Sequence, residues 1–150
     1  SFAGPVRRFD FHLKRNDIVL LDDYAHHPAE LKASIQSVKE LYPDKKITGI
    51  FQPHLYTRTR DFAADFAASL SLLDELILLD IYPAREEPIL GVTSQLIFDQ
   101  VTLKKKRMIK KEELLDLVKK EAADFQVVLM LGAGNIDRLV EPVKQILEKR

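Results

Sequence analysis

Short and almost wholly apolar runs alternate along the chain with longer segments in which apolar residues recur every three or four positions. Apolar runs of about four to eight residues are typical of strands buried on both faces of a sheet, and the longer repeat is typical of amphipathic helices. The strands predicted in this way are 18–23, 47–51, 107–109 and 126–131. Another apolar strand is predicted within 74–83, where it leads into a loop. The predicted helices are 28–41, one within 52–73, 94–101, 111–123, and a last one after the loop at 132–135.

Two of these helices carry a clear apolar stripe. Pro28 stands at the first position of one of them, where its missing amide hydrogen costs nothing. The stripe that follows consists of Leu31, Ile35, Val38 and Leu41. The stripe of the second helix consists of Phe62, Phe66, Ser69, Leu70 and Leu73. We expect both stripes to face the core.

The amino-terminal segment departs from the alternation. Residues 6–14 are rich in β-formers and are joined to the run at 18–23 by Arg-Asn-Asp, which predicts a hairpin. The whole pattern indicates the α/β class: a Rossmann-like, mainly parallel sheet with helices on both faces and one antiparallel strand from the N-terminal hairpin. We expect 1–150 to form a single domain, because the sequence contains no repeat or linker.

Composition narrows the function classes. The chain has 150 residues, and its 23 lysines and arginines balance 23 aspartates and glutamates, so no overall charge draws it to nucleic acid or to a membrane surface. The basic run at 104–107 is expected to be a solvated loop. Thiolate chemistry is excluded by the absence of cysteine, and no apolar run reaches the roughly 20 residues that span a bilayer. We expect a cytoplasmic protein and, because the sequence begins with Ser1 rather than methionine, one domain of a longer chain.

Candidate chemistry lies in the loops that follow the predicted strands, at 22–27, 52–60, 82–87 and 132–135. In sheets of this class, ligands bind beyond the carboxyl ends of the strands. We therefore expect these loops to meet at one edge of the sheet, with acids, histidines, arginines and helix N-termini side by side. Such an edge suits an anionic, phosphate-bearing ligand.

The residues alone leave several alternatives open at 22–27. Asp22 or Asp23 can cap a turn while the two histidines are exposed. A zinc site formed by His26, His27 and His54 is disfavoured, because adjacent side chains diverge and no spaced ligand pattern occurs.

The second loop and the glycines also have simple interpretations. Thr57 or Thr59 can cap the helix, but arginines at a helix start oppose the macrodipole unless an anion lies there. The sequence Gly-Ala-Gly-Asn at 132–135 can serve a tight turn alone. The chain contains neither GxxxxGK[ST] nor a complete GxGxxG, so it cannot form a standard phosphate cradle by itself.

The segments "RRFD", "DDYAHHPAEL", "FQPHLYTRTRDF", "LLDIYPAREEPI" and "LGAGNID", in this order and spacing, closely resemble the carboxy-terminal domain of the Mur ligase family. The resemblance covers nearly the whole chain. The paired histidines and "FQPH…TRTRD" resemble the branch that joins L-alanine to UDP-N-acetylmuramate. A sister branch, which attaches recycled tripeptide to the same sugar nucleotide, is similar around "DDYAHHP" but fits "FQPHLYTRTRD" less well.

This resemblance implies an ATP-dependent ligase of peptidoglycan synthesis. ATP phosphorylates the lactyl carboxylate of UDP-N-acetylmuramate, and the amine of L-alanine attacks the acyl phosphate to give an amide, ADP and phosphate. In the family, an N-terminal domain holds the UDP sugar and a central domain holds most of the ATP and Mg²⁺. The C-terminal domain closes over them and admits the amino acid. We therefore expect no activity from this domain alone.

The resemblance also assigns roles to individual residues. Arg8 corresponds to an arginine that reaches the ATP phosphates, and Asp23 to an acid that contacts the nucleotide, most plausibly at its ribose. Tyr24, His26 and Arg58 correspond to positions lining the amino-acid pocket, where Arg58 pairs with the alanine carboxylate. His26 either orients the amine or takes its proton.

Neighbouring positions are expected to support these roles. His27 packs or caps the following helix, and Asn135, with Gly132 and Gly134, shapes the edge where the substrate carboxylate and alanine meet. Leu55 is an arginine in many family members, so carboxylate recognition here has one guanidinium fewer. A metal- or histidine-dependent hydrolase and a standalone nucleotide sensor remain alternative interpretations.

Overall fold

The computed structural model describes residues 10–150, in which six strands form one sheet with the order β1-β2-β6-β3-β4-β5. The strands are β1 (Asp10–Lys14), β2 (Val19–Asp23), β3 (Ile47–Phe51), β4 (Glu75–Leu78), β5 (Lys106–Met108) and β6 (Val127–Leu131). β1 pairs antiparallel with β2, and all other neighbouring strands are parallel. The predicted sheet and its hairpin are confirmed.

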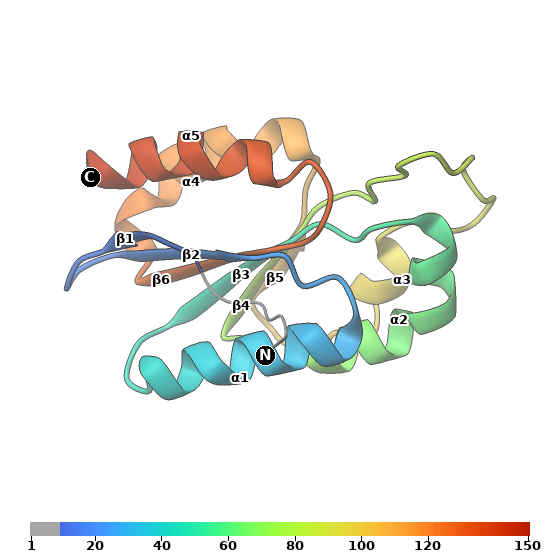
Figure 1. Ribbon diagram of the computed structural model, residues 1–150, viewed down its shortest axis with the longest axis horizontal. Helices are drawn as coiled ribbons and strands as arrows, with labels where there is room; N and C mark the ends of the chain where they lie inside the picture. Colours follow the sequence, from blue (N-terminus) through green and yellow to red (C-terminus); the bar gives the residue numbers. More distant parts are fainter. Residues whose placement is uncertain (1–9) are drawn as a thin grey trace, which may run out of the picture.

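Helices cover both faces of this sheet (Figure 1). One face carries α1 (Pro28–Leu41), α2 (Tyr56–Leu70) and the short α3 (Gln95–Phe98). The other face carries α4 (Leu114–Glu121), which is flanked by the 3-10 turns η1 (Lys111–Glu113) and η2 (Ala122–Asp124), and α5 (Asp137–Glu148). No helix among residues 10–150 has the length and apolar character needed to cross a membrane.

The core has two layers because successive side chains of a strand point to opposite faces. Leu21, Phe51 and Leu129 pack toward α1 and α2. Leu20 and Ile50 belong to the cluster on the α4 and α5 side. All five are buried, which explains why the central strands read as continuous apolar runs.

Three details differ from expectation. Phe62 is 43% exposed, because α2 is kinked at this residue (φ −124°, ψ 21°) and the buried stripe is interrupted there. Leu41, the last residue of α1, is 54% exposed. The helix predicted at 94–101 is shorter, spanning only Gln95–Phe98.

Candidate active site

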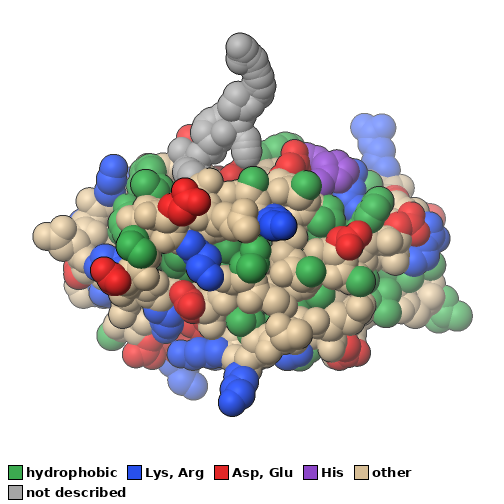
Figure 2. Space-filling model, turned by 90° about the horizontal axis from the view of Figure 1, so that it is seen from below, with side chains coloured by type: hydrophobic (Ala, Val, Ile, Leu, Met, Phe, Trp, Pro, Cys, Tyr) green, Lys and Arg blue, Asp and Glu red, His purple; other side chains and the backbone are tan. Residues whose placement is uncertain are grey.

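Four loops meet at one edge of the sheet because β2, β6, β3 and β4 are consecutive parallel neighbours. They follow the carboxyl ends of these strands, as predicted, and lie together beyond the sheet (Figure 1). Seen from the side of α1 and α2, histidine side chains reach the surface in one group (Figure 2). This edge holds the predicted site residues that the structure describes, whereas Arg8 lies outside residues 10–150.

The turn after β2 is held by two carboxylates. The backbone N–H of Ala25 donates to Asp23 Oδ1 at 3.2 Å, so Asp23, only 4% exposed, caps this turn. The backbone N–H groups of His26 and His27 both donate to Glu30 Oε1 at 3.0 Å. His27 occupies the N-cap position of α1, but its side chain makes no capping hydrogen bond, so Glu30 rather than the His27 ring satisfies the donors of this turn.

The orientation of the His26 ring follows from this turn. Its Nδ1 lies 3.0 Å from the carbonyl oxygen of Tyr24, which can only accept, so Nδ1 carries the hydrogen. In the neutral ring, Nε2 is therefore the proton acceptor. The ring contacts the exposed Tyr24 ring edge-on at 5.8 Å and stands perpendicular to the His54 ring at 6.2 Å. The His26 ring thus lies between Tyr24 of its own loop and His54 of the loop after β3.

Arg58 and His54 form the centre of the site. Arg58 Nη1 donates to His54 Nδ1 at 3.1 Å. Because a guanidinium only donates, this nitrogen must be unprotonated and His54 is neutral with its hydrogen on Nε2. Burial, then the positive charge of Arg58 and the neighbouring His26, lowers the pKa of His54 below its usual value. Burial and Arg58 likewise lower the pKa of His27.

The start of α2 is capped by a residue that sequence reasoning missed. Glu86 Oε1 accepts from the backbone N–H groups of Tyr56 (2.5 Å) and Thr57 (3.1 Å), and its Oε2 accepts from the Thr57 hydroxyl. Neither expected threonine caps the helix, since Thr59 Oγ1 instead donates to the Leu55 carbonyl at 2.9 Å. The anion expected at this helix N-terminus is therefore supplied by the chain itself.

The 52–55 and 82–87 loops are joined beside this cap. His54 and Tyr82 form an isolated parallel bridge, and their rings stack at 5.7 Å with an interplanar angle of 17°. Leu55 N–H donates to the Tyr82 carbonyl at 2.9 Å. Leu55 (φ 74°) and Ala84 (φ 54°) are the non-glycine residues with positive φ in the described chain. Such strained conformations tend to cluster at functional sites.

Gln52 connects the loop after β3 to the loop after β6. Its Nε2 donates to Asn135 Oδ1 at 2.8 Å, and its Oε1 accepts from the Ile136 backbone at 3.0 Å. Gly134 is required here, because a Cβ at this position would lie 2.5 Å from Gln52 Oε1 and 2.7 Å from the Tyr82 ring. Asn135 is thereby brought into the same assembly as His54, although its side chain bonds Gln52 while Arg58 bonds His54.

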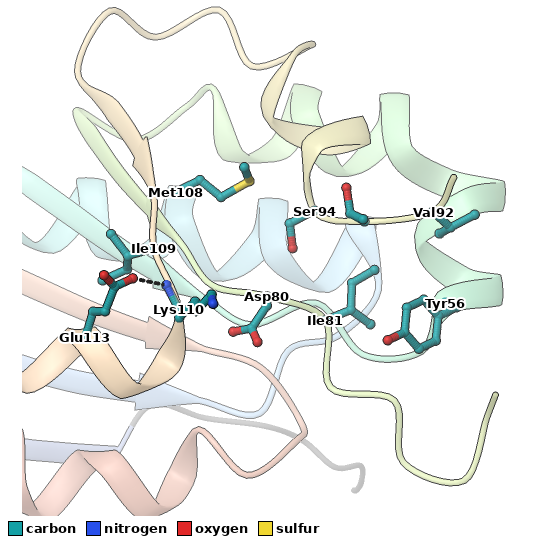
Figure 3. Close-up of a pocket in the computed structure, with 10 residues that line it drawn as sticks. Tyr56, Asp80, Ile81, Val92, Ser94, Met108, Ile109, Lys110 and Glu113 are labelled. Atoms are coloured by element: carbon teal, nitrogen blue, oxygen red, sulfur yellow. Dashed lines mark hydrogen bonds between the residues drawn. The ribbon is translucent and has the colours of Figure 1, made fainter. Parts of the chain in front are cut away.

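A separate pocket of about 400 Å³ lies at the ends of β4 and β5 (Figure 3). Tyr56, the first residue of α2, lines it from the side of the Glu86 cap. The other lining residues are Asp80, Ile81, Val92, Thr93, Ser94, Met108, Ile109, Lys110 and Glu113. None of the predicted site residues that the structure describes belongs to this lining. Among residues 10–150, no group of three histidines and acids is arranged to hold a metal ion.

Comparison with known proteins places this arrangement in a family. A family model described as Mur ligase, glutamate ligase domain, matches residues 7–134. The chain belongs to the Mur ligase family. The resemblance noted in the sequence is therefore confirmed at the level of the family.

Relatives within the Mur ligase family sharpen the comparison. The chain is 75% identical over its whole length to the UDP-N-acetylmuramate--L-alanine ligase of Parabacteroides distasonis and covers 32% of that protein. It is 59% identical to the ligase of the same name from Porphyromonas gingivalis, over 99% of the chain and 32% of the relative. The chain thus spans about a third of the length of these curated relatives, and it matches their C-terminal part.

Solved structures agree with this assignment. A UDP-N-acetylmuramate-alanine ligase from Thermotoga maritima superposes with a TM-score of 0.68 at 28% identity, over 95% of this chain and 29% of that chain. A murein peptide ligase from Psychrobacter arcticus gives a TM-score of 0.70 over 90% of this chain and 28% of that chain. The second pair is only 17% identical, so it shows the shared fold alone.

Proposed function

We propose that this chain is the C-terminal domain of an ATP-dependent ligase that joins L-alanine to UDP-N-acetylmuramate in peptidoglycan precursor synthesis. The observation that carries the proposal is the hydrogen bond from Arg58 to neutral His54, whose ring lies 6.2 Å from the His26 ring. A permanent cation at this place suits a zwitterionic amino acid, because it pairs with the carboxylate while His26 offers an acceptor for the amine proton. The identity of the relatives supports the same conclusion.

The reaction requires the chain to bind the amino acid and to accept a proton. ATP phosphorylates the lactyl carboxylate, and the neutral amine of L-alanine then attacks the acyl carbonyl and expels phosphate. Arg58 holds the alanine carboxylate through guanidinium donors that His54 does not use. His26 Nε2 accepts the proton that the amine loses, because its Nδ1 is already committed to the Tyr24 carbonyl. Tyr24 and Asn135 complete the pocket wall.

Asp23 and Arg8 are the residues proposed to contact the nucleotide. Asp23 lies at the end of β2 and is buried in the turn, so contact with a ribose hydroxyl requires the turn to open. Arg8 is proposed to reach the ATP phosphates. Mg²⁺ and most of the ATP are proposed to be held by the N-terminal and central domains of the complete protein, as the family resemblance implies. Use of ATP and a UDP sugar favours the bacterial cytoplasm.

Reassembly of a complete ligase tests this function. This chain replaces the matching C-terminal part of the Parabacteroides distasonis relative, and ADP release is measured with UDP-N-acetylmuramate and L-alanine. We expect the chimera to turn over within about tenfold of the intact relative, and the 150-residue chain alone to be inactive. A chimera that accepts only a tripeptide identifies a recycling ligase instead. A folded chimera that is silent with every amine contradicts a ligase function.

Replacing His26 with glutamine is expected to lower kcat in this chimera about 100-fold, the usual effect of losing a general base. The KM for ATP should stay constant, because the loss concerns the proton of the amine and not the binding of the nucleotide. The matched control is His27→Gln, which changes the exposed neighbour. A kcat in His26→Gln close to that of the parent, with only a raised KM for L-alanine, would restrict His26 to binding.

A further inference from the structure

Glu86 makes contacts that the proposed chemistry has not used. Its carboxylate is half-buried and accepts three hydrogen bonds from the first turn of α2. These bonds, led by that from the Thr57 hydroxyl, lower the pKa of Glu86 below its usual value, so the group is anionic at neutral pH. It therefore occupies the donors that would otherwise attract a substrate carboxylate to the helix N-terminus.

The backbone of Glu86 makes a second connection toward Arg58, through the loop that carries Tyr82. Glu86 N–H donates to the Pro83 carbonyl at 2.9 Å, which closes a turn directly after Tyr82. Tyr82 stacks on His54, and His54 accepts from Arg58. Arg58 itself lies in the first turn of the helix that Glu86 caps. The Glu86 carboxylate thus ties the turn of α2 that carries Arg58 to the loop that carries Tyr82.

We propose that Glu86 is a positioning residue for the amino-acid substrate: it fixes the first turn of α2 against the 82–87 loop and so directs the Arg58 guanidinium toward the substrate carboxylate. The inference rests on the proposed function for its kinetic consequence. Its structural consequence, the fixed pairing of Arg58 with His54, holds whatever the substrate is.

The kinetic test uses the chimeric ligase. We expect Glu86→Ala to raise the KM for L-alanine about tenfold or more while the KM for ATP changes less than about twofold, since misplacement by about 1 Å is costly. Glu86→Gln should restore most of the affinity, because its amide oxygen still accepts from both backbone donors. Thr57→Val, which removes only the hydroxyl donor, should have an intermediate effect. Glu87→Ala, at the exposed neighbour, serves as the control.

A second measurement separates this inference from the proposed function. The His54 titration is followed by NMR in the 150-residue chain, which needs no activity. Around His54 lie Arg58, His26 and Glu86. Loss of the Glu86 charge alone would lower the pKa of His54 further, whereas release of Arg58 and exposure of the ring would raise it. We expect the pKa of His54 to rise in Glu86→Ala and to fall slightly in Glu86→Gln, which loses the charge but keeps the cap.

The outcomes are distinct. A fall or no change in the pKa of His54 in Glu86→Ala overturns the positioning role, as does an equal rise in the KM for every substrate. If the wild-type chimera is inactive with L-alanine but the pKa of His54 rises as expected, the proposed function fails while the positioning of Arg58 stands.

Discussion

Replacing Arg58 with alanine is expected to raise the KM for L-alanine about 100-fold in the chimeric ligase, because a charge-assisted pair with the substrate carboxylate is lost. The KM for ATP should stay within about twofold, since Arg58 contacts His54, which lies outside the turn of Asp23 proposed to meet the nucleotide. Position 55 is a leucine, so the residue that precedes α2 offers no second guanidinium to compensate for the loss. Steady-state kinetics with each substrate varied in turn measure the effect.

Two variants make this test specific. Arg60→Ala removes a nearby cation of the same helix, which is exposed and paired with Asp61 at 2.8 Å, and should leave every KM within about twofold. Arg58→Lys keeps the charge but loses the planar fork, so the KM for L-alanine should rise about tenfold. Equal loss in Arg58→Ala and Arg60→Ala would show that general electrostatic attraction, rather than a defined pair, binds the carboxylate.

Replacing Glu75 with alanine is expected to lower the free energy of unfolding of the 150-residue chain by about 3 kcal/mol. The Glu75 side chain is 3% exposed and accepts from the Thr48 hydroxyl at 3.0 Å. Lys46 Nζ and Arg107 Nη2 each lie 3.3 Å from its carboxylate. Removal leaves the buried hydroxyl without this acceptor and the cations without their shared anion. Urea denaturation followed by circular dichroism measures the change.

The controls separate burial from charge. Glu40→Ala removes an exposed glutamate of α1 and should change stability by less than about 0.5 kcal/mol. Glu75→Gln preserves an acceptor for Thr48 but removes the charge, so it should lose less than Glu75→Ala. A loss below about 1 kcal/mol in Glu75→Ala would mean that solvent already screens Lys46 and Arg107 fully.

The Glu75 network also corrects the expectation for residues 104–107. Lys106 and Arg107 lie in β5 instead of a solvated loop. Lys106 Nζ donates to the carbonyls of Phe98 (2.6 Å) and Val101 (2.9 Å), and Arg107 pairs with both Glu75 and Glu121. A run of basic residues in a sequence does not reveal these partners. They lie in other segments of the chain, and the sequence pattern does not show that those segments lie beside the run.

The pattern of the chain by itself determined the alternation of strands and helices, the hairpin and the parallel sheet. These features depend on local periodicity and on burial of both faces of the sheet. Both are visible in the sequence as continuous apolar runs, which include Leu20, Leu21 and Ile50. The positions of the site loops followed from the same information, because parallel strands end at one edge. The motifs around His26 and Arg58 also indicated the family to which the chain belongs.

Only the tertiary structure decided which side chains meet at that edge. Glu86 lies 30 residues from Tyr56 and Gln52 lies 83 residues from Asn135, so no local spacing indicated either contact. The hydrogen bond from Arg58 that keeps His54 neutral depends on ring orientation, which Tyr82 sets from another loop. The order of the strands and the closure of the loops determine which side chains become neighbours in such contacts. The sequence pattern indicates burial and periodicity but not these pairs.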